Sequence, residues 1–190
     1  MERKYIEDKV YEKVDFTVIG IELAEYDNCK FINCNFSNIN LSNIAFTECE
    51  FQGCNLGMAK LTKTSFRDVK FMHCKLLGLH FQDCDSFLIS FYFEHCQLNL
   101  ASFYKLNLKK IHFNDCILHE VDFTETDISN GKFEVCDFAK AIFDNTNMEK
   151  ADFRSALNYS IDPTKNKIKK ARFALPGVIG LLDHYDIVIE

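Results

Sequence analysis

Residues 31–51 read FINCNFSNINLSNIAFTECEF, and a large apolar side chain returns at every fifth position of this stretch. This five-residue period holds from Phe16 to Phe81. It resumes at Leu88, after a two-residue insertion, and ends at Phe153. Within it, one phenylalanine recurs every twenty residues, with a single interval of twenty-two. This column consists of Phe31, Phe51, Phe71, Phe93, Phe113, Phe133 and Phe153. A chain that returns to the same face every twenty residues is a solenoid, in which these rings stack in one column.

The five-residue unit fits neither the 3.6-residue period of a helix nor the two-residue period of a simple strand. Two places before each large residue stands a mostly smaller one, such as Cys34, Ala59 or Ala101, and the other three positions are mostly polar. We therefore expect two inward side chains per unit and a corner every five residues. Asn, Ser and Asp tolerate such corners well.

This pattern resembles the pentapeptide-repeat family, whose motif is a small residue, Asp or Asn, Leu or Phe, and two variable residues. The units Cys34–Asn38, Val121–Glu125 and Ala151–Ser155 match it closely. The resemblance covers twenty-eight units in residues 14–155. It implies an all-β solenoid, a right-handed quadrilateral β-helix of about seven regular coils. At the ~4.8 Å strand spacing, seven coils make a rod of roughly 34 Å.

The unbroken repeat favours one domain, and its ends define four segments. We expect an N-terminal cap at 1–13, the β-helix at 14–155, an irregular last coil at 156–174 and a capping or dimerisation segment at 175–190. Pro176 suits the first turn of a short helix that runs to about Asp183. Residues 187–189 read as a strand. An open end of a β-helix exposes unpaired backbone and needs such a cap.

All nine cysteines are expected at inward small positions, where a thiol acts as a compact hydrophobe. His73-Cys74 and His95-Cys96 look like metal pairs, but adjacent residues point to opposite sides of the wall. We therefore expect reduced core cysteines, with neither a disulfide nor a metal site.

Other features narrow the function classes. The net charge of −6 disfavours direct nucleic-acid binding. Sorted by face, the outward charges of the seven coils sum to a small negative value on each face, so no acidic stripe emerges. No catalytic or cofactor-binding motif is found, so neither enzyme activity nor a cofactor is expected. The sequence shows no signal peptide or membrane span, and a cytoplasmic location is the default.

The five-residue period is interrupted between Phe81 and Leu88. We place two extra residues near Cys84-Asp85 and keep Leu88 inward. On this register Phe87, Ile89 and Tyr92 face outward as a candidate patch for a partner. The alternatives are a bulge that swells around oversized side chains, or a register that is off by one residue. A second break contains the basic cluster Lys165–Arg172, which is either a solvated cap or an anion site.

The C-terminal segment resembles the module that joins two rods end to end in quinolone-resistance (Qnr) pentapeptide proteins. The resemblance implies a homodimer. Its expected interface residues are Val178, Ile179, Leu181, Leu182, Ile187 and Ile189. It also implies a DNA-shaped protein that binds a type II topoisomerase, namely gyrase, and modulates its quinolone susceptibility. The alternative is a generic interaction scaffold with another protein partner.

Overall fold

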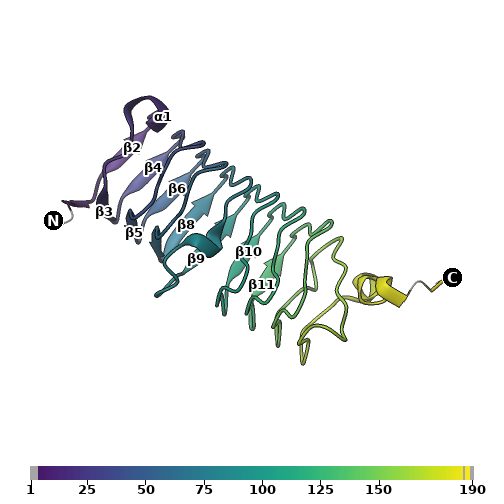
Figure 1. Ribbon diagram of the computed structural model, residues 1–190. Coiled ribbons are helices and arrows are strands. Elements are labelled where there is room, and N and C mark those ends of the chain that lie inside the picture. The colour runs from purple at the N-terminus through teal and green to yellow at the C-terminus, as the bar shows by residue number, and fades with distance from the viewer. Residues whose placement is uncertain (1–3, 186, 189–190) are drawn as a thin grey trace.

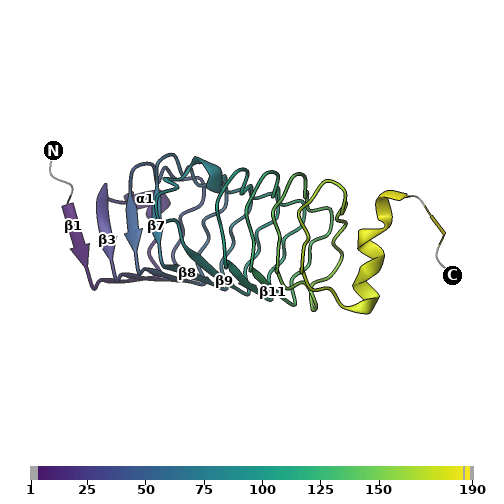
Figure 2. The same cartoon turned by 90° about the horizontal axis from the view of Figure 1, so that it is seen from below.

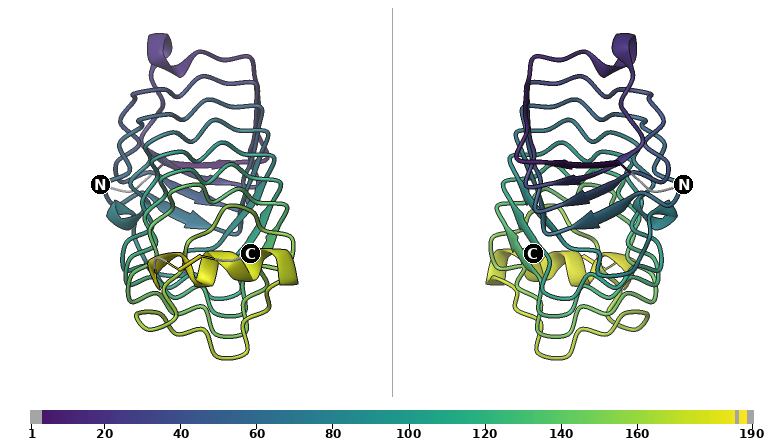
Figure 3. Two further views of the ribbon diagram at one scale, coloured as in Figure 1. Left: turned by 90° about the vertical axis from the view of Figure 1, so that its right-hand side faces the viewer. Right: turned by 90° about the vertical axis from the view of Figure 1, so that its left-hand side faces the viewer.

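The computed structural model describes residues 4–185 and 187–188 and is a right-handed β-solenoid (Figure 1). About seven regular turns form a straight rod, and the two ends of the chain lie at opposite ends of it (Figure 2). Viewed along the rod, the coils have four walls (Figure 3). The fold class predicted from the five-residue beat is confirmed.

We number the four walls by the large residue that each unit turns inward. Face 1 carries the phenylalanine column that includes Phe31 and Phe113, and face 2 carries Phe36, Leu56 and their successors. Face 3 carries the column of Leu41 and Phe81. Face 4 carries Tyr26, Phe46 and Phe66 and resumes at Leu108.

Two of the faces are parallel sheets. On face 1, seven strands pair in the order β11-β10-β9-β8-β6-β4-β2. They are β2 (Val10–Glu12), β4 (Lys30–Ile32), β6 (Glu50–Gln52), β8 (Val69–Met72), β9 (Phe91–Glu94), β10 (His112–Asn114) and β11 (Lys132–Glu134). On face 4, β1 (Lys4–Glu7), β3 (Ala24–Asp27), β5 (Ala45–Thr47) and β7 (Ser65–Arg67) pair in chain order. Elsewhere the coils meet through isolated parallel bridges.

The phenylalanine column is continuous and extends beyond the regular repeat at both ends. The ring centroids of successive members lie 4.5–5.7 Å apart, from Phe31 to Phe173. At the N-terminal end, Tyr11 stacks on Phe31 at 5.0 Å. Two strands, β1 and β2, thus lie within the segment 1–13 that was expected to be only a cap.

The small inward residues link neighbouring coils. The thiol of Cys54 donates to the carbonyl oxygen of Phe31 (3.2 Å), and the hydroxyl of Thr64 donates to that of Leu41 (2.8 Å). Cys and Thr suit this position because each is small and carries one donor. All nine cysteines are buried and free of disulfides, as predicted from their positions.

Most corners place their last residue in the left-handed region. The φ angle of this residue is, for example, 59° at Asn38, 52° at Asp68 and 55° at Val135. Asn and Asp adopt this conformation readily, whereas a β-branched residue is strained in it. The short helix α1 (Phe16–Ile19) replaces one corner, ends at Gly20 and projects from the first coil.

The insertion lies later than the sequence suggested. Ser86, not Leu88, stands at the central position of its unit, and the two extra residues are Ile89 and Ser90. Leu88 takes a left-handed φ of 57° and is 66% exposed, so its expected inward position is wrong. The cause is Phe91, whose buried ring fills the space that Ser86 leaves empty. A short 3-10 helix, η1 (Phe81–Asp83), precedes the bulge.

The C-terminal end is closed by an irregular coil and two 3-10 helices. Phe173 returns to the column 5.6 Å from Phe153, while Tyr159 is buried beside both rings. The helices η2 (Leu175–Leu181) and η3 (Asp183–Tyr185) follow, and η2 has proline in its first turn as expected. They lie across the end of the rod (Figure 2).

Candidate interaction surfaces

The mid-rod bulge exposes one aromatic ring. Phe87 is 64% exposed, and the guanidinium carbon of Arg67 lies 5.7 Å from its ring centroid. The backbone N–H of Phe87 donates to the Asp85 carboxylate (3.0 Å), which fixes the turn that presents the ring. The bulge is therefore an ordered projection of face 4.

The three residues of the predicted patch do not share one surface. Phe87 projects from face 4, whereas Ile89 is half-buried and packs against the core. Tyr92 is half-buried on β9 of face 1, where its ring meets that of His112 edge-on at 5.2 Å. The expected outward position of Ile89 is wrong because the bulge turns inward again before Phe91.

The C-terminal helix η2 is seated on Tyr159. A Cβ atom at Gly180 would lie 2.0 Å from the carbonyl oxygen of Tyr159, and one at Gly177 would lie 2.2 Å from its hydroxyl oxygen. The Gly180 carbonyl also accepts a hydrogen bond from the N–H of Ile161 (2.8 Å). Only glycine lets the helix approach this closely. Sequence reasoning did not identify this contact, although two glycines in one short helix are a usable signal.

Some of the predicted dimer residues pack against the rod, and others are exposed to solvent. Leu181 packs against the core, and Val178 and Leu182 are half-buried. Ile179 and Ile187 are 53% and 55% exposed. No strand is assigned at 187–188, and Ile189 lies outside the described residues. Two further apolar side chains at this end, Leu175 and Val188, are 86% and 87% exposed.

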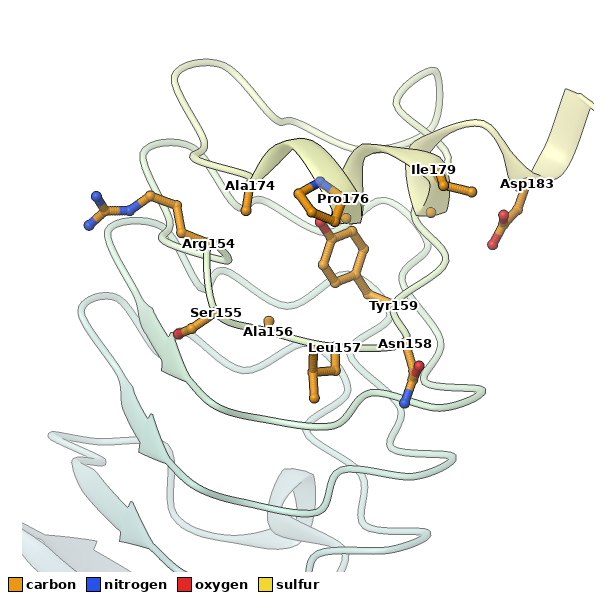
Figure 4. Close-up of a pocket in the computed structure, with 12 residues that line it drawn as sticks. Arg154, Ser155, Ala156, Leu157, Asn158, Tyr159, Ala174, Pro176, Ile179 and Asp183 are labelled. Atoms are coloured by element: carbon orange, nitrogen blue, oxygen red, sulfur yellow. The ribbon is translucent and has the colours of Figure 1, made fainter. Parts of the chain in front are cut away.

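A groove runs between η2 and the last regular coil (Figure 4). Its walls include Ala156 and Leu157 on one side and Pro176 and Ile179 on the other. The Tyr159 ring points from the coil toward Pro176 in the close-up. The Tyr159 hydroxyl is buried without a hydrogen-bond partner, and burial raises its pKa. The groove is mainly apolar, with no arrangement of acid, base and nucleophile.

Face 2 carries an apolar row that sequence reasoning missed. Met58, Leu77 and Leu100 come from three successive coils and are 57%, 44% and 54% exposed. Gly78 lies beneath the Met58 thioether, where a Cβ atom would be 2.5 Å from the sulfur. These three residues line one shallow groove. Recurrence of apolar residues at the outward positions of successive units could have revealed it.

The His-Cys pairs are split by the wall, as expected. Cys74 and Cys96 are buried, whereas His73 and His95 are exposed and stack on each other at 4.7 Å. Across residues 4–185 and 187–188, no group of three or more His, Cys, Asp or Glu is placed to hold a metal ion. Nor does that part of the chain contain a helix of the length and apolarity that a membrane crossing requires.

The basic cluster of the last coil is exposed on two faces. Lys167, Lys169 and Lys170 project from face 4, and Arg172 follows on face 1. The Arg172 guanidinium lies 3.8 Å from the carboxylate of Asp152, which Arg154 also contacts at 2.7 Å. These contacts lower the pKa of Asp152, with the Arg154 hydrogen bond as the largest cause.

Comparisons with known proteins agree with the geometry. The family model described as "Pentapeptide repeat region" matches residues 24–103, and the model "Pentapeptide repeats (8 copies)" matches 96–134 and 136–156. No curated protein sequence matches the chain.

Among solved structures, a trypsin-treated variant of QnrB1, a plasmid-mediated fluoroquinolone resistance protein, is similar. Its identity is 18% and its TM-score 0.50, over 99% of this chain and 98% of that chain. HetL, a pentapeptide-repeat protein involved in heterocyst differentiation regulation in the cyanobacterium Nostoc sp. strain PCC 7120, is 14% identical. Its TM-score is also 0.50, over 88% of this chain and 84% of that chain. At these identities the likeness concerns the fold.

Proposed function

This chain belongs to the pentapeptide-repeat family, and on that premise we propose that it is a non-catalytic, cytoplasmic protein-interaction rod that binds a type II topoisomerase. It occupies the enzyme's site for duplex DNA and thereby modulates the action of quinolones on gyrase. The observation that carries the proposal is the continuous stack of coils, which offers a long, regular surface.

The dimensions of the rod support this role. The column from Tyr11 to Phe173 has nine rows, and eight steps of ~4.8 Å give a length of about 38 Å. Two rods joined end to end, with their caps, exceed about 76 Å. This length corresponds to a little over twenty base pairs at ~3.4 Å each.

The C-terminal end supports the end-to-end dimer. Leu175, Ile179, Ile187 and Val188 are exposed apolar side chains at the C-terminal end of the rod. Exposed apolar surface of this kind is a feature of protein interfaces. We propose that residues 175–188 of two copies meet there, with Leu181 holding each cap on its own coil.

A resemblance in fold to QnrB1, itself a fluoroquinolone resistance protein, is consistent with the topoisomerase partner. The alternative is a scaffold for a different protein, and the row Met58, Leu77 and Leu100 favours it. Methionine-containing apolar rows are adaptable binding surfaces that do not depend on a resemblance to DNA.

A competition experiment distinguishes the two. Purified gyrase is immobilised, and the rod is bound in the presence of increasing linear duplex DNA. The proposal predicts modest, salt-sensitive binding that duplex DNA displaces. Binding that DNA does not displace but that Leu77→Ser abolishes would place the gyrase contact on the row Met58, Leu77 and Leu100 and would contradict occupation of the DNA site. Absence of binding at micromolar concentrations would exclude the topoisomerase.

A further inference from the structure

The charge of face 4 reverses along the rod. Nine rows of outward residues follow one another along this face, one from each coil. Parallel pairings join the rows on either side of the bulge, and residues 89–91 of the bulge lie beside residues 108–111 of the next coil. The rows are residues 5–8, 25–28, 45–48, 65–68, 85–88, 107–110, 127–130, 147–150 and 167–170. Summed over the whole face the charges nearly cancel, which hides the reversal from any face-by-face count of the sequence.

The first four rows are acidic. Six carboxylates project from them, and Arg67 is the only cation in these rows. The carboxylates belong to Glu7, Asp8, Glu25, Asp27, Glu48 and Asp68. Neighbouring polar groups hold two of them in place: Asp27 accepts from the Tyr5 hydroxyl, and Asp8 accepts from the Asn28 amide (2.7 Å).

The last four rows are basic. Six lysines are exposed there, against the two carboxylates of Asp127 and Glu149. The lysines are Lys109, Lys110, Lys150, Lys167, Lys169 and Lys170. Within residues 4–185 and 187–188, Lys109 alone among them has a carboxylate within ion-pair distance, Asp127 at 3.6 Å. The basic half is thus largely without internal partners.

The fifth row, at the centre of the nine, is the bulge. It presents Phe87 and Leu88, which are 64% and 66% exposed, between the acidic and the basic half. Beside it, a shallow groove crosses the acidic half over the small side chains of Ala45 and Ser65.

We propose that face 4 binds face 4 of a second copy of this chain, with the two rods side by side and antiparallel. A two-fold axis through the bulge then sets the acidic half of each copy against the basic half of the other. Such an isologous contact is closed and self-complementary. A parallel arrangement would instead place like charges opposite each other.

The bulge supplies the apolar centre of this contact. Exposed ion pairs contribute little individually and are screened by salt, so charge alone orients the two rods more than it holds them. Phe87 and Leu88 of both copies meet at the axis, where an aromatic anchor is most effective. Nucleic acid is a poorer occupant because the acidic half repels phosphate.

This contact uses the side of the rod and is independent of the topoisomerase partner and of the end-to-end dimer proposed above. Cross-linking separates the two contacts, because all nine native cysteines are buried. Ser86→Cys introduces an exposed thiol near the proposed axis and leaves Phe87 and Leu88 in place, and Val188→Cys introduces one at the rod tip. Val135→Cys, at an exposed corner of face 1, measures random collision.

Under mild oxidation at micromolar concentration, Ser86→Cys is expected to form a disulfide-linked dimer at least ten times faster than Val135→Cys. High salt is expected to slow it toward the Val135→Cys rate. Equal rates for the two variants at low salt would overturn the proposal, whatever the Val188→Cys variant does.

Charge reversal supplies the second test, in the Ser86→Cys background. Lys109, Lys110, Lys169 and Lys170 are changed to Glu in one variant, and Glu7, Asp8, Glu48 and Asp68 to Lys in another. Each is expected to lose the rate advantage, and the variant with all eight changes is expected to regain it, because its polarity is merely inverted. Circular dichroism checks that each variant is folded. Failure of the eight-fold variant to recover, in a folded protein, would overturn the antiparallel contact.

Discussion

The ring of Phe91 lies 5.6 Å from that of Phe66, in the gap that Ser86 leaves in the face 4 column. Phe91 stands at a position that smaller residues occupy elsewhere, and it also contacts Phe81 at 5.1 Å. The insertion at Ile89 and Ser90 is thereby accommodated: the chain bulges outward, and one oversized inward ring refills the core.

The first prediction concerns this replacement. Phe91→Ala should destabilise the protein by about 3–5 kcal/mol, because it empties a filled site in the core. Phe87→Ala removes an exposed ring from the same bulge and should change the free energy of unfolding by less than about 1 kcal/mol. Denaturant unfolding measures both. Similar effects of the two substitutions would show that the register at the bulge is incorrect.

The second prediction concerns backbone strain at a corner. Val135 is β-branched and holds a φ of 55°, and its side chain is 55% exposed. Asn tolerates this conformation, so Val135→Asn should stabilise the protein by about 1 kcal/mol. Val18→Asn is the control, because Val18 is also an exposed valine (80%) but lies in α1, outside the left-handed region. A gain in the control as large as that at Val135 would mean that removing an exposed valine, rather than strain, is responsible.

The third prediction concerns the C-terminal cap. Gly180→Ala should detach η2, because the added methyl group would overlap the Tyr159 carbonyl oxygen and the backbone there cannot move away. We expect light scattering at high salt, where the face 4 contact is screened, to show loss of the end-to-end dimer while the β-sheet circular dichroism of the rod is retained. Gly57→Ala, whose Cβ atom would lie 3.3 Å from the Asn55 side-chain oxygen and 3.7 Å from Leu77, should change neither observable. A Gly180→Ala protein that remains dimeric at high salt would exclude the cap from the interface.

The fourth prediction concerns the buried thiols at alkaline pH. Burial raises the pKa of Cys49 to about 12 and raises that of Cys84 as well. An unfolded cysteine ionises near pH 8.5. Above that pH the unfolded state releases protons that the native state keeps, so the stability contributed by neutral burial is lost as pH rises toward 12.

Unfolding by denaturant at pH 8 and pH 10 measures this loss, which the variant Cys49→Ala should reduce. In the native protein at pH 8, a thiol reagent should react with none of the nine cysteines rapidly, and with all nine after unfolding. One fast-reacting native thiol would contradict the buried assignment at that position.

Much of this architecture could be predicted from the sequence, since each residue of a pentad has a single environment. The five-residue period directly predicts the phenylalanine column and the buried cysteines. It also predicts that His73 and Cys74 lie on opposite sides of the wall. The sequence could not locate the bulge, because two inserted residues can stand at several positions without changing the five-residue period on either side. Only the packing of Phe91 decides between them.

The surfaces were harder to predict for a different reason. Outward residues are not constrained by the core, so the sequence gives their face but not which neighbours they meet. Ile89 turned inward with the bulge, and the charge reversal of face 4 depends on position along the rod as well as on the face. The packing of η2 depends on Tyr159. This residue lies in the irregular coil, where no five-residue period indicates which side chains point inward.

The measurement that tests the proposed function most directly is a supercoiling assay with gyrase from the source organism, with and without a quinolone. The account predicts that the rod at micromolar concentration inhibits supercoiling or restores it in the presence of the drug. It also predicts that Gly180→Ala weakens that effect, because this substitution is expected to remove the proposed end-to-end dimer and so to halve the length of the rod. Supercoiling and drug inhibition that remain unchanged at every concentration of the folded protein would contradict it.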